Sequence, residues 1–351
     1  MAPAATLDNP IYQTLGKTFQ LARIGAGVLP YSQGNAVSLE LPNALLQKGI
    51  TLRLSGNAVI SVASATANFS EMPLGLIKNL RIIGDGRRVL FASPGRDLYR
   101  LAHFTWGKQW ELSPSLLTVG TRPFSATIRI DHESLMNIDP VESLFDPRLY
   151  KKVVVEVTWG AVADIIQVGG ATVQLSAVQM DVLVEQTNEG ITKILFDHEV
   201  SADEQTVTAT SRLFTFKVPQ NGLLFGVMMR TDRDAGGGAG PVPVDDIINT
   251  VTLKSDTTVA HFDQVDWDTA QREMVARFQA DGGATPGAQI PGYLYLPLTE
   301  MGMISSALNT NALNDLRLIL DVTKTSGTEI VHVTYDWLVP RRTLGQTAVA
   351  A

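Results

Sequence analysis

The chain of 351 residues contains no cysteine, and this absence excludes several kinds of chemistry at once. Without cysteine the chain can form no disulfides, no thiolate nucleophile and no cysteine-ligated zinc site. Its stability must therefore come from packing within the chain and from contacts between subunits.

Long apolar runs are also missing. No segment approaches the length of a bilayer span, and the N-terminal residues lack the basic start and apolar middle of a signal peptide. We therefore expect a protein that is made and used without secretion. With 45% hydrophobic and 18% charged residues the chain can build a sizeable core, and its length suits two domains.

Positive charge is scarce in the second half. Residues 1–190 hold 16 basic and 16 acidic residues, whereas residues 191–351 hold 12 and 19, so the second half carries the whole net charge of −7. An acidic surface repels phosphate backbones, and we expect no direct, specific nucleic-acid binding. The basic pairs Arg87-Arg88, Lys151-Lys152 and Arg341-Arg342 are too small to change this, and ordinary solvated charges are the preferred interpretation.

What the chain does contain is an internal repeat. A ladder of short apolar segments between residues 17 and 184 recurs in the same order between residues 193 and 339. The offset between matched residues shrinks from 177 to 155 along the chain, as expected when surface loops gain or lose residues. The matched pairs are Pro42 with Pro219, Asn79 with Asn249, Phe104 with Phe278, Val157 with Val322, and Asp181 with Asp336.

The repeat predicts two homologous domains. We expect an N-terminal arm at 1–16, a first domain at 17–187, a second domain at 188–340 and a C-terminal tail at 341–351. The alternative is that β-rich segments resemble one another under a forgiving alignment.

Periodicity predicts a mostly β structure. Apolar and polar residues alternate in segments such as 50–54, 124–130, 316–320 and 330–335, which is typical of antiparallel strands with one covered face. The sequence Gly84-Asp85-Gly86 predicts a tight hairpin. Helical spacing is found in two places only, after Ser93-Pro94 and after Asp266.

Each half is therefore expected to contain about eight strands with one helix inserted midway. Eight antiparallel strands in two packed sheets form a jelly roll. The predicted fold class is all-β, with two tandem eight-stranded jelly rolls that each carry one helix.

This organisation resembles the double-jelly-roll major capsid proteins of tailless icosahedral viruses, especially bacteriophages with an internal membrane. The resemblance covers nearly the whole chain but rests on architecture, not on a short signature. It implies a homotrimer in which six sandwiches stand upright and form a pseudo-hexagonal tile, with termini directed inward and loops outward. The loops here are compact, which places a tall outward tower in doubt. The resemblance also implies minor capsid or vertex proteins as partners, and leaves open whether a membrane underlies the shell.

The two predicted helices are candidates for lateral contacts between copies if both lie at the same edge of their sandwiches. They are equally suited to capping their own barrels. For the interfaces themselves we consider Trp106, Trp110 and Phe124, or Trp267 and Phe278, with burial in the core as the rival interpretation.

Catalytic patterns are absent from the sequence. The strongest candidate is a pair of tripeptides, Asp131-His132-Glu133 and Asp197-His198-Glu199. In a strand the two carboxylates point to one face and the histidine to the other, so three convergent ligands are not expected and polar residues at a strand end are the preferred interpretation. Nucleophile elbows, zinc-hydrolase motifs and phosphate loops are not found, and we predict no catalytic, cofactor or metal site.

One loop could hold a hard cation. Asp232, Asp234, Asp245 and Asp246 flank the glycine-rich segment 236–240, but their spacing matches no standard calcium loop and a solvated loop is preferred. The five tryptophans indicate core or interface anchors more than a sugar platform.

Three functions from different classes remain. The first is a structural capsid tile in a virion, assembled in the host cytoplasm; the second is a carbohydrate-binding or adhesive protein; the third is a two-jelly-roll hydrolase or amidase. Exposed aromatic residues on one sandwich face would favour the second, and convergent carboxylates in a cleft would favour the third.

Overall fold

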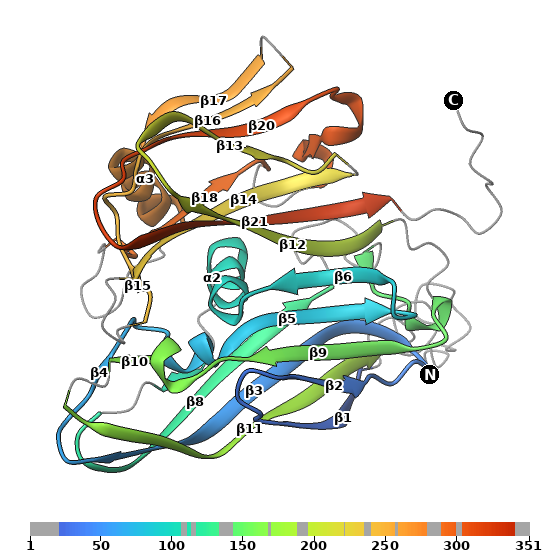
Figure 1. Cartoon of the computed structure of the whole chain (residues 1–351). Coiled ribbons are helices and arrows are strands. Elements are labelled where there is room, and N and C mark those ends of the chain that lie inside the picture. The colour runs from blue at the N-terminus through green and yellow to red at the C-terminus, as the bar shows by residue number, and fades with distance from the viewer. Residues whose placement is uncertain are drawn as a thin grey trace, which may run out of the picture.

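The structure is a computed structural model. It describes residues 21–106, 111–113, 117–132, 143–167, 170–187, 196–220, 222–234, 240–256, 259–278, 289–299 and 304–340. Two β-sandwiches lie one above the other in Figure 1, the first half of the chain below and the second half above.

The first sandwich is built from two sheets. One sheet has the strand order β1-β11-β3-β8-β7, and the other strands of this half follow the order β2-β9-β5-β6. Their bounds are β1 (Leu21–Pro30), β2 (Ala36–Glu40), β3 (Leu46–Ser61), β5 (Ile77–Gly84), β6 (Arg88–Ser93), β7 (Leu112–Ser113), β8 (Gly120–Asp131), β9 (Val153–Trp159) and β11 (Thr172–Thr187). The two-residue strands β4 (Thr66–Ala67) and β10 (Ile166–Gln167) pair separately.

The second sandwich repeats this plan. Strand β21 pairs with β12 and β14, β14 also pairs with β18, and the facing sheet has the order β13-β20-β16-β17. The bounds are β12 (Phe196–Val207), β13 (Ser211–Lys217), β14 (Leu223–Asp234), β15 (Val242–Pro243), β16 (Ile248–Ser255), β17 (Val259–Asp266), β18 (Tyr293–Pro297), β19 (Leu308–Asn309), β20 (Leu316–Val322) and β21 (Thr328–Pro340).

Strand order identifies both sandwiches as jelly rolls. When the eight long strands of each half are numbered along the chain, one sheet contains strands one, eight, three and six, and the other contains two, seven, four and five. This is the two-sheet arrangement of a jelly roll, so the predicted fold class is confirmed.

Alternating hydrophobicity explains why these segments form strands. In β9 the residues Val153, Val155, Val157 and Trp159 are buried and the residues between them are not. The alternate residues of β20 are buried in the same way. Burying each such side chain contributes about 1.5–3 kcal/mol, which fixes which face of the strand is turned inward.

The predicted hairpin is present. Strands β5 and β6 pair through Gly84 and Arg88, and both Asp85 and Gly86 have positive φ. Two consecutive residues with positive φ are typical of a type I′ turn, whose twist matches that of the flanking strands.

Both predicted helices are present in equivalent places. Helix α2 (Gly95–Trp106) follows the fifth strand of the first roll, and α3 (Trp267–Phe278) follows the fifth strand of the second. Asp266 caps α3, since its carboxylate accepts a hydrogen bond from the Thr269 backbone N–H. Among the described helices none is long and apolar enough to cross a membrane.

The first anchor of the repeat is confirmed by backbone hydrogen bonds. The N–H of Leu41, just before Pro42, bonds to the carbonyl of the first residue of β9 at 2.9 Å. The N–H of Val218, just before Pro219, bonds to the first residue of β20 at the same distance. Pro42 and Pro219 therefore occupy equivalent positions.

Two other anchors lie in the correct strands but in shifted register, and a third pair lies in the corresponding turn of the two helices. The residues that accept the two bonds just described are the first residues of β9 and β20. Val157 is the fifth residue of β9 and Leu320 is the fifth residue of β20, so Val157 corresponds to Leu320 and not to Val322. Asn79 corresponds to Thr250 and not to Asn249. Asn79 is the first residue after the register shift between β5 and β9, and Thr250 is the first residue after the equivalent shift between β16 and β20. Phe104 and Phe278 both lie in the last turn of their helices.

Asp181 and Asp336 lie in the equivalent strands β11 and β21, but four residues apart in register. Gly49 of β3 and Gly226 of β14 each adjoin a register shift against the last strand of their roll. Gly49 is paired with Glu185, and Gly226 with Asp336, so Glu185 is the counterpart of Asp336. A period-two pattern can slip by an even number of residues without exposing its apolar face, which is why the sequence alignment missed the shift.

Candidate functional site: the junction between the two jelly rolls

One sheet continues from the first roll into the second. Strand β6 pairs in parallel with β12, with Phe91 opposite Val200 and Ala92 opposite Ser201. The result is a ten-stranded sheet whose main path runs β15-β14-β21-β12-β6-β5-β9-β2. Because β6 is the fifth strand of one roll and β12 the first strand of the other, the two rolls run in the same sense along the junction.

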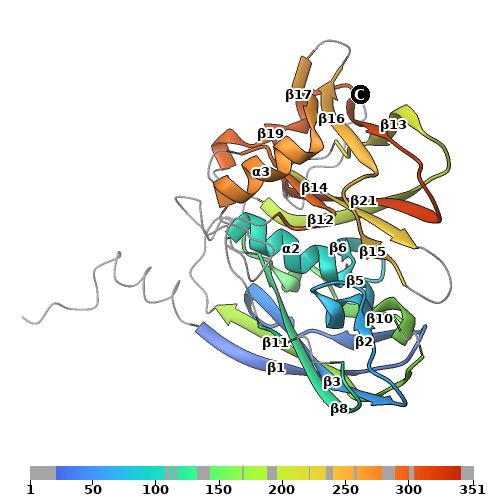
Figure 2. The same ribbon diagram turned by 90° about the vertical axis from the view of Figure 1, so that its left-hand side faces the viewer.

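Helix α2 lies inside this junction, between the two sandwiches (Figure 2). All ten residues from Gly95 to Phe104 are buried, although they include Arg96, Asp97, Arg100 and His103. In the single chain α2 is therefore not available for lateral contacts. Helix α3 differs, because Asp268, Thr269, Arg272 and Glu273 remain exposed.

Two buried ion pairs connect α2 to the second roll. Asp97 accepts hydrogen bonds from Nε and Nη2 of Arg230 in β14, and Arg96 donates to both carboxylate oxygens of Asp232 at 3.3 Å. Arg230 also contacts Asp232. Buried charges are costly unless paired, so this arrangement specifies one mutual placement of helix and sheet.

The opposite side of α2 is held within the first roll. Arg100 contacts Glu71, which precedes the short helix η1 (Met72–Leu76), and donates to the hydroxyl of Ser70 at 3.3 Å. Burial alone would raise the pKa of Glu71, but Arg100 and Arg96 outweigh burial and lower the pKa. Glu71 is therefore ionised, and α2 has charged partners on two sides.

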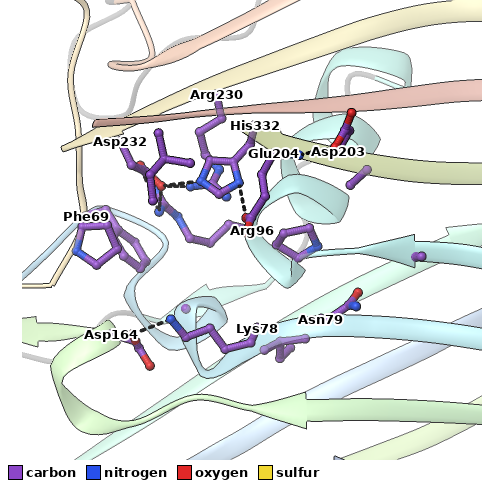
Figure 3. Close-up of a pocket in the computed structure, with 17 residues that line it drawn as sticks. Phe69, Lys78, Asn79, Arg96, Asp164, Asp203, Glu204, Arg230, Asp232 and His332 are labelled. Carbon is purple, nitrogen blue, oxygen red and sulfur yellow. Dashed lines mark hydrogen bonds and ion pairs between the residues drawn. The ribbon is translucent and has the colours of Figure 1, made fainter. Parts of the chain in front are cut away.

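A cavity of about 520 Å³ opens beside these ion pairs, between the rolls (Figure 3). Its lining mixes cations and anions, and Lys78 and Asp164 form an ion pair of 2.6 Å at its lower wall. Its labelled lining residues are Phe69, Lys78, Asn79, Arg96, Asp164, Asp203, Glu204, Arg230, Asp232 and His332.

The His332 ring lies at the upper wall of this cavity. Its Nδ1 is 3.3 Å from Glu204, and its Nε2 is 3.5 Å from Asp232. Burial first, and then the nearby charge of Arg230, lower the pKa of His332. A neutral imidazole in this position donates to Glu204. The cavity lining then holds three cations and four carboxylates, so the charges nearly balance.

The two Asp-His-Glu tripeptides meet at the other side of the junction, which the sequence did not predict. His198 lies 2.6 Å through Nδ1 from the backbone carbonyl of Asp131, and 2.6 Å through Nε2 from the carboxylate of Asp336. His198 lies near the start of β12, as the interpretation of polar residues at a strand end expected, and its ring also links β12 to the end of β8.

Both partners of His198 are hydrogen-bond acceptors, so both ring nitrogens must carry a proton. Burial alone would lower the pKa of His198, but the Asp336 carboxylate and the Asp131 carbonyl outweigh burial and raise it. The geometry and the direction of the pKa agree on an imidazolium.

His132 lies close by but has the opposite character. Its ring packs edge-to-face against Phe91, which packs in the same way against His198. Burial, then the charges of His198 and Arg129, lower the pKa of His132 to about 3. His132 is therefore neutral beside a charged His198. Glu133 lies outside the described residues.

Arg88 completes this side of the junction. Its Nη2 is 2.9 Å from Asp197 and 2.7 Å from Glu199, both in β12. The interpretation of Arg88 as an ordinary solvated charge was wrong, because it joins the two rolls. Lys152 pairs at the surface with Glu40, as that interpretation expected.

The aspartates of the predicted cation loop do not converge. Asp232 faces the ion pairs of the junction, Asp246 pairs with Arg233, and Asp245 accepts from Trp267, Gln271 and Gly292. Across the described ranges no cluster of three histidine or carboxylate side chains could hold a metal ion. Residues 235–239 lie outside the described part of the chain.

The aromatic interface candidates are core residues wherever they are described. Phe124 and Trp267 are buried in the hydrophobic core. The side chains of Trp106 and Phe278, and all of Trp110, lie outside the described residues. The rival interpretation of burial in the core is therefore correct for Phe124 and Trp267.

The charged residues of α2 are the functional feature that sequence reasoning missed. Arg96, Asp97 and Arg100 lie within an arc of about 100° around the helix axis, which is the pattern of a solvated helix face. Sequence pattern alone therefore carries no signal that this charged face is buried against the second roll.

Comparison with solved structures identifies the fold. The chain is similar to the MCP of STIV, the Sulfolobus turreted icosahedral virus, with a TM-score of 0.68 and 14% identity over 94% of this chain and 100% of that chain. It is similar to the major capsid protein P2 of bacteriophage PM2, with a TM-score of 0.59 and 12% identity over 93% and 100% of the two chains.

A third match is the PBCV-1 virus capsid, with a TM-score of 0.58 and 10% identity over 94% and 97% of the two chains. No protein-family model matches the sequence, and no curated protein matches it. The chain thus has the double-jelly-roll fold of these capsid proteins over nearly its full length.

Proposed function

We propose that this protein is a major capsid protein, a structural tile that forms pseudo-hexameric homotrimers in an icosahedral viral shell. The observation that carries the proposal is the junction: two jelly rolls are joined side by side, in the same sense, by one continuous sheet and a buried charged helix. A subunit of a regular shell must keep a fixed angle between its two jelly rolls. Bending at this junction would separate buried ion pairs, which is costly. The likeness to the capsid structures over nearly the whole chain supports the same function.

The proposal extends to the organisation of the chain. Its parts are an N-terminal arm (1–16), a first jelly roll (17–187), a second jelly roll (188–340) and a C-terminal tail (341–351). Both rolls begin and end at one end of the molecule, since Leu21 pairs with Thr187 and Phe196 with Pro340. The arm and tail leave from that end, which we place at the inside of the shell.

The remaining parts follow from the role of a tile. The partners are other copies of the chain, with minor capsid or vertex proteins at the edges of the lattice, and the place of action is the virion after assembly in the host cytoplasm. No catalytic activity is part of this function.

Negative-stain electron microscopy of the purified full chain tests the proposal. We expect particles with a hexagonal outline and three-fold averages, or closed shells. Single particles of monomer size at micromolar concentration would contradict it.

A further inference from the structure

One edge strand of the second roll has its outer backbone groups occupied by side chains of its own chain. Strand β13 pairs only with β20 among the described residues, so its other side is a free edge. Figure 2 shows β13 on the side of the second roll that lies opposite α3. A free edge offers N–H and C=O groups to any other strand, and proteins protect such edges by specific means.

The backbone direction of β13 alternates along the strand. The Val218 N–H bonds to the carbonyl of Leu316 across the pair. Because every second residue faces the partner strand, Phe216 also faces β20, and Thr215 turns its N–H and C=O to the outside. Leu213, two positions earlier, turns the same way. Its side chain is 75% exposed, so this part of the edge is open to solvent.

Three side chains bond to these outward backbone groups. The Leu213 N–H donates to the hydroxyl oxygen of Ser211 at 3.2 Å, and the Leu213 carbonyl accepts from the hydroxyl of Thr215 at 3.1 Å. The Thr215 carbonyl accepts from Nε2 of Gln205, in the preceding strand β12, at 3.2 Å. We call Gln205, Ser211 and Thr215 the edge caps. Each cap occupies a backbone group that an added strand would need.

The segment under the caps has the composition of a strand that associates readily. Residues 213–216 read Leu-Phe-Thr-Phe, four residues of high β propensity or high hydrophobicity without charge or proline. Arg212 and Lys217 flank the segment and are exposed. Flanking charges oppose aggregation. They leave the middle of the segment, where the caps lie, to be protected in another way.

We propose that the edge caps keep β13 from accepting a strand of a second copy of this chain. An added strand would have to break three existing hydrogen bonds before making its own, so it would gain nothing from these backbone groups. A second copy is the partner to exclude, because every copy carries the same apolar segment at the same edge. This inference goes beyond the proposed function, since it concerns a surface that stays out of contact between copies.

Removal of the caps tests the inference. In the triple variant Gln205→Ala, Ser211→Ala, Thr215→Val, three backbone groups lose their partners and become available to another chain. Each backbone hydrogen bond is worth about fivefold in an association constant, so three should raise it about a hundredfold. Sedimentation velocity over a concentration series should therefore show species larger than those of wild type at about a hundredfold lower concentration.

The matched control removes the same three kinds of side chain from another strand. Thr172, Gln174 and Ser176 are exposed residues of β11, and in the described part of the chain none of their side chains bonds to a backbone group. The variant Thr172→Val, Gln174→Ala, Ser176→Ala should sediment like wild type.

A fourth substitution distinguishes pairing at the edge from misfolding. Leu213→Lys in the triple variant places a charge in the middle of the opened edge and should return the sedimentation profile to that of wild type. The single variants Gln205→Ala, Ser211→Ala and Thr215→Val should each raise the association constant about fivefold. The test therefore does not depend on the folding of the triple variant.

The outcomes are distinct. Larger species that form in the triple variant and disappear with Leu213→Lys would support the inference. Single variants and a folded triple variant that all sediment like wild type would overturn it, as would larger species that also form in the control or persist with Leu213→Lys. None of these results bears on the proposed function, because the wild-type species is the reference throughout, whatever its size.

Discussion

Arg230 of β14 and Asp97 of α2 form a buried ion pair across 133 positions of the sequence, and this pair fastens one jelly roll to the other. Asp97 is fully buried and Arg230 nearly so. Neither charge can return to water without opening the junction. Stability of the chain and the mutual placement of the two jelly rolls therefore depend on the same contact.

Removing one partner of this pair should be costly. Asp97→Ala leaves Arg230 buried beside a single remaining carboxylate, and we expect a loss of about 3–5 kcal/mol in the free energy of unfolding. Urea denaturation measures this loss. Arg272→Ala, which breaks an exposed pair with Asp268 on α3, is the control and should cost less than about 0.5 kcal/mol. Equal effects of the two variants would contradict the role of the junction.

The His198 imidazolium should make stability fall at alkaline pH. Its folded-state pKa is raised above the unfolded value of about 6.5, so its contribution is complete below about pH 6.5 and is lost as the pH rises through the folded pKa. Thermal unfolding between pH 6 and 9 measures the effect. The variant His198→Gln should be less stable than wild type at pH 6, and its unfolding temperature should change less with pH. Nitrogen NMR at pH 7 should find both ring nitrogens protonated; a neutral ring would refute this assignment.

His132 should limit stability on the acid side. Its folded-state pKa of about 3 lies below the unfolded value, so the unfolded chain takes up a proton first as the pH falls from about 6.5. The loss approaches about 1.4 kcal/mol per pH unit for one proton. His132→Phe should remove this part of the acid sensitivity, measured as the difference in unfolding temperature from wild type between pH 4 and 6.5. Parallel curves for the two proteins would count against it.

Gly240 should tolerate no side chain. A Cβ at this position would lie 2.0 Å from the carbonyl oxygen of Ala163, a backbone atom of the other roll that cannot rotate away. We expect Gly240→Ala to cost about 1–3 kcal/mol through overpacking at the junction. A Cβ at Gly170 would meet no atom within 4 Å, so Gly170→Ala is the control and should be close to neutral. Denaturant midpoints compare the two, and equal midpoints would contradict the close approach at Gly240.

Local patterns explain which parts of the fold could be predicted. The alternation of β9 and β20, the hairpin at Asp85 and the two helices depend on residues close in sequence, so strand and helix assignments were correct. The residue-by-residue alignment of the two halves does not depend on such local patterns. Asp181 and Asp336 were matched four residues apart, because a slip by an even number keeps the same face inward.

The junction could not be predicted from the sequence because its contacts join distant residues. His198 binds Asp131 and Asp336, which lie 67 and 138 positions away. Nothing near His198 in the sequence indicates either partner. The charges of α2 were visible, but their buried partners appear only when β14 is placed beside the helix.

Sedimentation equilibrium of the full chain at micromolar concentration and neutral pH tests the central claim most directly. The chain has a mass of 37.9 kDa, and we predict a single species of three times that mass, about 114 kDa. A persistent species of 37.9 kDa in correctly folded protein would contradict the account of this chain as a trimeric capsid tile.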